Sequence, residues 1–280
     1  ATFEAGDQWI DTNAIPNSHL VRYVDVEAAG SNVYISWVDL NFTSKPAVWF
    51  SMSPNYGAAG SWTAPQPVDP VGAYQYIQDY ARLACSGNNV YAAWQDSRVA
   101  GSVHMNASQD GGVTWSTLTV TRVDNGSSNS SIYMEMCAPT AAAKMSNKPQ
   151  LGAMGPANVS GTAASVGGGN VVGRSLHSGS GVKPVYVCYR DYSNGSLADI
   201  YFNYSLDGGV TWGATHKRMD VHTPAGSIWC GDPAIAASKN WVYVVWLDGK
   251  DDPTPGASPY IDDIYVRYSN NYGQNSWVPN

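Results

Sequence analysis

The sequence predicts an all-β fold assembled from repeated antiparallel sheets, and three observations support this. The stretch Ser108-Gln109-Asp110-Gly111-Gly112-Val113-Thr114-Trp115 returns almost unchanged as Ser205–Trp212. A second pattern, an apolar strand that ends in aromatic-x-Asp, recurs four times. Turn residues and alternating apolar residues fill the remainder, and few windows show a helical period. Repeats of this kind predict a β-propeller of four antiparallel blades, with five as the alternative if 125–184 contains another.

The residues of the repeated stretch suit a tight turn. Glycines accept positive φ, and an Asp carboxylate accepts hydrogen bonds from amides of its own turn. The Trp supplies a large side chain that can be buried beside the turn. Two looser copies precede Trp62 and Trp277. The positions to which we assign this structural role are Ser108, Asp110, Gly112, Trp115, Ser205, Asp207, Gly209, Trp212, Asn55, Trp62, Asn271 and Trp277.

The four copies of S-x-[DN]-x-G…[ST]-W resemble the Asp-box (BNR) repeat of the sialidase-like β-propeller superfamily. In that family the Asp-boxes lie opposite the active site, so the resemblance implies a fold and not an activity. A sialidase would also need three arginines, a Tyr paired with a Glu, and an Asp acid/base. The family's Arg-Ile-Pro signature is absent, because Ile15-Pro16 follows Ala14. Glu is scarce, and Glu135 with nearby Tyr133 is the best candidate catalytic pair.

The aromatic-x-Asp motif ends the strands Val33–Asp39, Val90–Asp96, Val185–Asp191 and Val242–Asp248. Successive copies are 57, 95 and 57 residues apart, so the third unit carries an insertion. A catalytic group is normally single, whereas these Asp residues recur once in each unit. We therefore expect them to be structural caps that bind loop amides.

The repeats describe one domain, 1–280, with the blades at 19–69, 70–124, 125–220 and 221–280. The third blade carries the insertion 145–184, and its inner strand is expected at Thr140–Lys144. Three blades end in an apolar residue plus Asp, and the fourth has no residues left for that strand. Gln8-Trp9-Ile10-Asp11 repeats this ending near the N-terminus. Residues 1–18 are therefore predicted to close the last blade and to remove an exposed sheet edge.

The composition excludes some partners and favours an exported protein. A net charge of −7 and a pI near 5.0 argue against nucleic acid, which needs a basic face. No apolar run reaches the length of a membrane span. Low charge and frequent Asn-x-Ser/Thr sequons predict a secreted or cell-surface glycoprotein. The glycosylation candidates are Asn41, Asn125, Asn129, Asn158 and Asn194, whereas Asn106 and Asn203 match only because the repeat begins with Ser.

Two further groups of residues could bind metal or form cross-links. Clustered carboxylates suit Ca²⁺, but the acidic loop matches no EF-hand spacing, so a solvated loop without cofactor is expected and Ca²⁺ is the alternative. This loop contains Asp248, Asp251, Asp252, Asp262 and Asp263. The four cysteines lack C-x-x-C spacing, and both two disulfides and four small buried thiols fit them. They are Cys85, Cys137, Cys188 and Cys230, and the sequence does not determine a pairing.

The expected function is that of a non-catalytic extracellular propeller that binds glycans or assembles with copies of itself. Abundant Tyr and Trp favour such surfaces, since these side chains suit half-buried contacts with a partner. A sialidase-like glycoside hydrolase is the alternative, and a scaffold for protein partners is the second alternative. The neutral insertion 145–184 interrupts what should be a short turn, so we expect the propeller body or a neighbouring subunit to order it.

Overall fold

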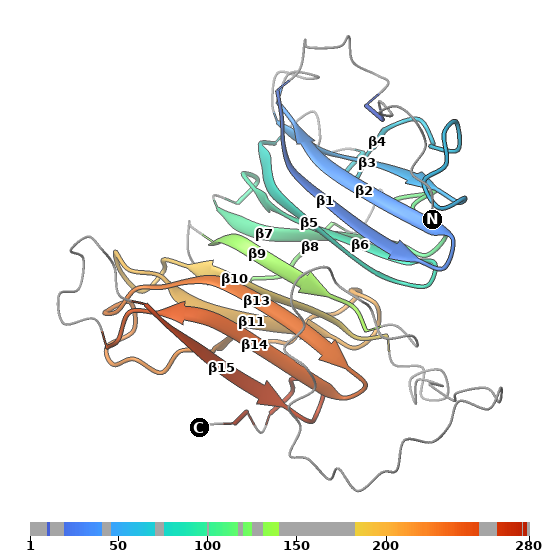
Figure 1. The fold of residues 1–280 in the computed structure, drawn as a ribbon. Coiled ribbons are helices and arrows are strands. Elements are labelled where there is room, and N and C mark those ends of the chain that lie inside the picture. Colours follow the sequence, from blue (N-terminus) through green and yellow to red (C-terminus); the bar gives the residue numbers. More distant parts are fainter. Residues whose placement is uncertain are drawn as a thin grey trace, which may run out of the picture.

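The computed structural model describes residues 10–11, 20–40, 46–70, 76–99, 101–116, 120–124, 131–139, 183–251, 262–275 and 277–278. All regular structure in these residues is β-strand, and the strands form four antiparallel sheets (Figure 1). The predicted all-β fold with four blades is therefore confirmed. Nowhere in the described ranges does a helix occur that is long and apolar enough to cross a membrane.

Each sheet is built from strands that follow one another along the chain. The first sheet contains β1 (Val21–Ala29), β2 (Asn32–Asp39), β3 (Ala47–Ser53) and β4 (Gln66–Pro67). The second contains β5 (Gln78–Ser86), β6 (Asn89–Asp96), β7 (Ser102–Ser108) and β8 (Thr121–Arg122). The third contains β9 (Ser131–Cys137), β10 (Val185–Asp191), β11 (Asp199–Ser205) and β12 (Lys217–Arg218). The fourth contains β13 (Cys230–Ser238), β14 (Trp241–Asp248) and β15 (Asp263–Ser269).

The inner strand of the third sheet differs from the expected one. It is β9, which begins at Ser131, whereas the strand was expected at Thr140–Lys144. Residues 140–182 lie outside the described residues, and these include nearly all of the insertion. Chain order is otherwise as expected, since the strands of each sheet fall within the predicted range for one blade.

The hydrophobic core lies between successive sheets rather than within one of them. Strand β10 of the third sheet is buried along its whole length because sheets lie on both of its faces. Strand β3 of the first sheet is equally buried, and its face away from the second sheet forms a small cluster with Ile10. Three clusters of buried side chains result, one at each junction between sheets. Large members of these clusters are Phe50 and Trp94 at the first junction, Met105 and Tyr189 at the second, and Phe202 and Trp246 at the third.

The repeated turns pack closely against the preceding sheet. At Gly112, with φ +83°, an added Cβ would lie 2.3 Å from the Phe50 ring on β3. A Cβ added at Gly209 would lie 2.1 Å from Met105 Cε, and one added at Gly273 would lie 2.4 Å from Phe202 Cζ. Each of these glycines therefore supplies both a positive φ and a close approach that a side chain would prevent.

Hydrogen bonds inside the turn hold this glycine in place. Ser108 Oγ accepts the Gly112 amide at 2.8 Å and donates to Asp110 Oδ1 at 2.7 Å. The amide and hydroxyl of Thr114 both donate to the Asp110 carboxylate, at 2.9 and 2.6 Å. Burial acts to raise the pKa of Asp110, but the bonds from Thr114 and Ser108 outweigh it and lower the pKa. The turn 205–211 contains the same set of bonds.

The four sheets form an arc whose first and last members lie at opposite ends of the molecule (Figure 1). The segment predicted to close the last blade lies mostly outside the described residues. Ile10, at its end, packs against a cluster of the first sheet, not the fourth. In each of the first three sheets, the segment of the final strand bonds to the same position of the strand before it, and the residue there is buried: Val48, Val103 or Ile200. The equivalent residue of the fourth sheet, Ile264 of β15, is 75% exposed. The position of Ile10 therefore differs from the predicted one.

We expect Gly112→Ala to lower the free energy of unfolding by about 3 kcal/mol, because the new methyl group combines a strained φ with overpacking against Phe50. The control is Gly30→Ala, since Gly30 also has a positive φ but its added Cβ would meet nothing within 4 Å. That variant should lose only the backbone component, about 1 kcal/mol. Equal losses in urea titrations of the two variants would contradict the packing role of Gly112.

Candidate functional site

The inner strands β1, β5, β9 and β13 share a backbone irregularity. Each contains a β-bulge at the same place, and the residue there has a left-handed φ. These residues are Tyr23 (53°), Tyr80 (50°), Tyr133 (51°) and Asp232 (44°). For a residue with a side chain this conformation costs about 1–2 kcal/mol. Such strain is often retained at functional sites, and here it recurs on all four inner strands.

Three of these residues form a continuous row, the tyrosine row of Tyr23, Tyr80 and Tyr133. The ring centroids are 4.5 Å apart between Tyr23 and Tyr80, and 5.0 Å apart between Tyr80 and Tyr133. A hydrogen bond with Tyr23, followed by burial, raises the pKa of Tyr80. A hydrogen bond with Tyr80 raises the pKa of Tyr133, whose side chain is 40% exposed. The row thus presents neutral phenols, with its open end at Tyr133.

A charged residue stands two positions after each tyrosine of the row. Arg82 Nε donates to Glu135 Oε1 at 3.1 Å, which joins β5 to β9. Asp25 joins β1 to β5, because its Oδ2 accepts the Leu83 amide at 2.8 Å and its Oδ1 accepts the Val26 amide. Burial raises the pKa of Asp25. These carboxylates are therefore held by donors of the protein.

At the open end of the row, three aromatic rings surround one cation. The Arg190 guanidinium carbon lies 4.9 Å from the ring centroid of Tyr133, 5.3 Å from Trp229 and 5.5 Å from Tyr192. Trp229 lies against Gly231, where an added Cβ would be 2.3 Å from the indole ring. We call Arg190, Tyr133, Tyr192 and Trp229 the Arg190 cluster. Cation–π attraction accounts for its arrangement.

Arg190 is only 8% exposed, and its Nε has no hydrogen-bond partner in the described part of the chain. Its other contact is a hydrogen bond to the Tyr192 hydroxyl. Within the described ranges Arg190 forms no ion pair with a carboxylate. A buried guanidinium in this state attracts an acceptor, such as a carboxylate or a hydroxyl group.

The candidate catalytic pair, Tyr133 and Glu135, lies on β9 within this site, but its members are not activated. A nucleophilic tyrosine needs a lowered pKa, whereas that of Tyr133 is raised. Glu135 is bound by Arg82. The sequence reasoning named this pair and missed Arg190, Tyr192 and Trp229. A signal for the row was present, since Tyr-apolar-charged recurs at 23–25, 80–82 and 133–135.

The aromatic-x-Asp caps behave as predicted. The carboxylates of Asp96, Asp191 and Asp248 accept the amides of Arg98, Ser193 and Lys250 at 2.7, 2.7 and 3.0 Å. The indole N–H groups of Trp94 and Trp246 also donate to the cap Asp, whereas Trp37 Nε1 of the first sheet has no hydrogen-bond partner in the described part of the chain. This accounts for the spacing of the motif, because alternate residues of a strand point to the same face.

The acidic loop is only partly described, since Asp252 lies outside the described residues. Asp248 is buried and bound by His222 and Trp246, and Asp251 accepts the Tyr265 hydroxyl at 2.6 Å. Asp263 begins β15 opposite Asp248, with Asp262 just before it. Among the described residues the carboxylates of this loop do not converge on a common point, so the Ca²⁺ alternative gains no support from them.

The sequons and cysteines fall into distinct environments. Asn194 lies exposed in a turn, whereas Asn41, Asn125, Asn129 and Asn158 lie outside the described residues. Asn106 and Asn203 are buried, and each donates to a carbonyl at a junction between sheets. Cys85, Cys137, Cys188 and Cys230 are all free thiols, in agreement with the second of the two alternatives.

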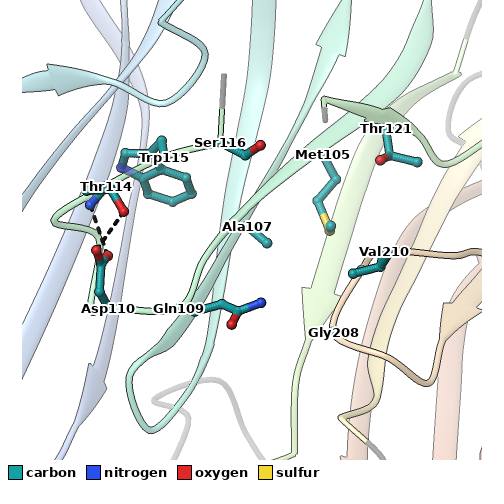
Figure 2. A pocket seen from close by; sticks show the side chains of 11 residues that line it. Met105, Ala107, Gln109, Asp110, Thr114, Trp115, Ser116, Thr121, Gly208 and Val210 are labelled. Atoms are coloured by element: carbon teal, nitrogen blue, oxygen red, sulfur yellow. Dashed lines mark hydrogen bonds between the residues drawn. The ribbon is translucent and has the colours of Figure 1, made fainter. Parts of the chain in front are cut away.

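A surface hollow lies between the repeated turns of the second and third sheets, and Figure 2 shows its lining. Asp110 reaches its rim, but both carboxylate oxygens are engaged by Thr114 (Figure 2). Its lining includes Trp115 and Met105 of the second sheet and Gly209 and Val210 of the third. Because Asp110 and Thr114 bond to each other, neither carboxylate oxygen of Asp110 is left without a donor for a ligand in the hollow.

No family model matches the chain, and neither does any curated protein. Among solved structures it is similar to a GH93 α-L-arabinofuranosidase of Fusarium graminearum in complex with arabinobiose. The TM-score is 0.51 at 13% identity, over 94% of this chain and 67% of that chain. For the complex of the α-L-arabinofuranosidase Arb93A from the same organism with an iminosugar inhibitor, the TM-score is 0.51 at 12% identity, and the match covers 92% of this chain and 65% of that chain. For the NanB sialidase from Streptococcus pneumoniae, the TM-score is 0.46 at 12% identity, and the match covers 87% of this chain and 29% of that chain.

The class that the fold defines is therefore the β-propeller. At these identities the likeness concerns the fold alone. The chain spans about two thirds of the length of the arabinofuranosidase.

Proposed function

We propose that this propeller binds glycans at its inner strands without hydrolysing them. The observation that carries the proposal is the Arg190 cluster, in which three aromatic rings surround a nearly buried guanidinium at the open end of the tyrosine row. Sugar rings have apolar faces that stack on aromatic side chains, and hydroxyls that accept and donate hydrogen bonds. Ligand sites commonly combine such an aromatic lining with a few fixed polar groups.

The charge of the site favours a glycan that carries a carboxylate. Arg190 forms no ion pair with the described residues, whereas Arg82 is neutralised by Glu135. A bidentate carboxylate matches the geometry of a guanidinium. A uronic acid would thus add an ion pair to the stacking contacts. The arabinofuranosidases of similar fold, in complex with arabinobiose or an iminosugar, support a relation to carbohydrates by analogy of fold only.

The state of the carboxylates supports binding over hydrolysis. Glycoside hydrolysis uses two carboxyl groups that are free to act as acid and as base or nucleophile. Asp25 accepts two backbone amides, and Glu135 is held by Arg82. Tyr133 has a raised pKa. A secreted or cell-surface setting, as expected from the sequence, would suit a protein that captures glycans.

We expect Trp229→Ala and Arg190→Gln each to weaken binding of a polygalacturonic-acid oligosaccharide at least about tenfold, which corresponds to roughly 1.4 kcal/mol. Isothermal titration calorimetry measures this. The control is Tyr56→Ala, which removes an aromatic side chain that is 76% exposed in the turn of the first sheet. An equal loss in the control, or no binding by the parent chain, would contradict the proposal.

The hydrolase alternative is tested on the same preparations. We expect no turnover of fluorogenic α-L-arabinofuranosides, glucuronides or sialosides, because Asp25 and Glu135 are held by protein donors and the pKa of Tyr133 is raised. Turnover that disappears in Glu135→Gln, while Glu27→Gln retains it, would replace the binding proposal with the hydrolase.

A second candidate function, self-association, rests on the two ends of the arc. Phe50, Met105 and Phe202 each receive the turn glycine of the next sheet. Val266 holds the same position on β15, receives no turn glycine from the described residues, and is 42% exposed. At the opposite end of the arc, Val24 and Val26 of β1 are exposed. The residues at the equivalent positions of β5, Ala81 and Leu83, are buried in the cluster between the first two sheets.

The chain thus has an exposed face on β15 at one end, where a turn glycine would pack, and at the other end an exposed face on the first sheet, which carries such a turn. We propose that two copies associate head to tail, with the Gly57 turn of one copy against Val266 of the other. Such a contact would continue the junction that already repeats inside the chain, and it would cover exposed apolar surface.

We expect Val266→Asp to abolish concentration-dependent association, since it would bury a charge in the proposed contact. Sedimentation velocity over a range of concentrations measures the change. Val113→Asp serves as the control, because Val113 is similarly exposed but lies in the turn of the second sheet. A parent chain that stays monomeric throughout, or a control that dissociates equally, would rule out this mode of assembly.

A further inference from the structure

Each junction between neighbouring sheets contains two buried carboxylates. One belongs to the Asp that ends a sheet, and the other belongs to the cap Asp of the next sheet. The pairs are Asp69 with Asp96, Asp124 with Asp191, and Asp220 with Asp248, and all six residues are at most 2% exposed. Two like charges in such a place are unfavourable unless other groups compensate them.

In the first two junctions, ordinary polar groups supply that compensation. At the first, Gln78 Nε2 donates to Asp69 Oδ2 at 3.0 Å, and Arg98 forms ion pairs with Asp69 and Asp96. At the second, Ser131 Oγ lies 3.0 Å from Asp124 Oδ2 and 2.8 Å from Asp191 Oδ2, within hydrogen-bond distance of both. Arg122 pairs with Asp124 at 2.5 Å.

The third junction has a different composition. In the first two junctions the residue paired with the cap Asp across the two inner strands is Gln78 or Ser131. At the third junction the residue paired with the cap Asp is Cys230. The ligand-capable atoms of Asp220, His222 and Cys230 all lie within 4.8 Å of one another. His222 Nε2 is 2.9 Å from both oxygens of Asp248, and Cys230 Sγ is 3.7 Å from Asp248 Oδ2. Four residues with oxygen, nitrogen and sulfur ligand atoms therefore converge.

The arginine of this junction does not complete the compensation. Arg218 Nε donates to the Asp220 backbone carbonyl at 3.1 Å, and its NH2 group donates to the His222 carbonyl. Asp220 Oδ1, 3.4 Å from Arg218 Nε, accepts no hydrogen bond although it is buried. Arg218 is thus shared among Asp199, Asp220 and two backbone carbonyls, and Asp220 Oδ1 still has room for a metal ion.

We propose that the third junction binds Zn²⁺, with Asp220, His222, Cys230 and Asp248 as its ligands. Zn²⁺ accepts thiolate, imidazole and carboxylate ligands together, usually in tetrahedral geometry. The mixed set with sulfur disfavours Ca²⁺ and Mg²⁺, which take oxygen ligands. On binding, the Cys230 thiol releases its proton to solvent, and the His222 ring carries its proton on Nδ1 so that Nε2 is free to coordinate.

The ion would have a structural role. Asp220 and His222 follow the last strand of the third sheet, whereas Cys230 begins β13 and Asp248 ends β14. Zn²⁺ would connect the third and fourth sheets at the place where Arg98 connects the first and second. No coordination position is needed for a substrate, so we expect the site to be closed.

The test uses the full chain, stripped of metal and kept reduced, with Zn²⁺ and Co²⁺ as probes. We expect one Zn²⁺ to bind per chain and to raise the melting temperature. Co²⁺ should give a thiolate-to-cobalt charge-transfer band in the near ultraviolet. Cys230→Ser, which reproduces the Ser131 of the second junction, and His222→Gln should each weaken Zn²⁺ binding at least about 100-fold. Cys188→Ala removes another buried thiol and should leave binding unchanged.

Each outcome decides the matter. A parent chain without the charge-transfer band, or one that binds Zn²⁺ no more tightly than Cys230→Ser, would overturn the proposal. Equal loss in Cys188→Ala would do the same. If Cys230→Ser fails to fold, the cobalt spectrum of the folded parent and of His222→Gln still distinguishes a thiolate site from none.

Discussion

The close contact between a turn glycine and the preceding sheet is the constraint on which the rest of the structure depends. At Gly112, Gly209 and Gly273 the backbone comes so near to a core side chain that no Cβ fits. The Ser and Asp of the better-formed turns hold this glycine at positive φ through bonds inside the turn. Each sheet is thereby positioned on the one before it, and the apolar clusters between sheets follow from that spacing.

The same stacking brings the inner strands side by side and so creates the candidate site. Tyr23, Tyr80 and Tyr133 come from three different sheets and are 57 and 53 residues apart in the chain. They meet because each inner strand bulges at the same position. The contacts among the rings and the ion pair from Arg82 to Glu135 offset part of the cost of three left-handed backbone conformations. The strained residues and the candidate site thus lie on the same edge of the arc.

The sequence was sufficient to predict the four sheets, because the turn that positions them is encoded locally. Asp110 and Thr114 are close in the chain and bond to each other there. The Arg190 cluster was not predictable in this way, since it needs the register of β9 against β10 and the placement of Trp229 against Gly231. The expected inner strand of the third blade was misplaced because the segment beginning at Cys137 resembles the one beginning at Cys230. The structure instead matches Ser131 to Cys230.

Repetition also explains where unusual chemistry should be sought in such a fold. The backbone contacts are the same at every junction, so the polar positions between sheets can differ while the stacking stays intact. A pair of buried carboxylates is tolerated with Gln78 and Arg98 at one junction, and with Ser131 and Arg122 at the next. At the third junction Arg218 is divided between long ion pairs with Asp199 and Asp220 and hydrogen bonds to backbone carbonyls, and a buried carboxylate oxygen of Asp220 accepts no hydrogen bond. Because buried polar atoms without a hydrogen bond are rare in folded proteins, this departure from the repeat is the observation on which the proposed metal site rests.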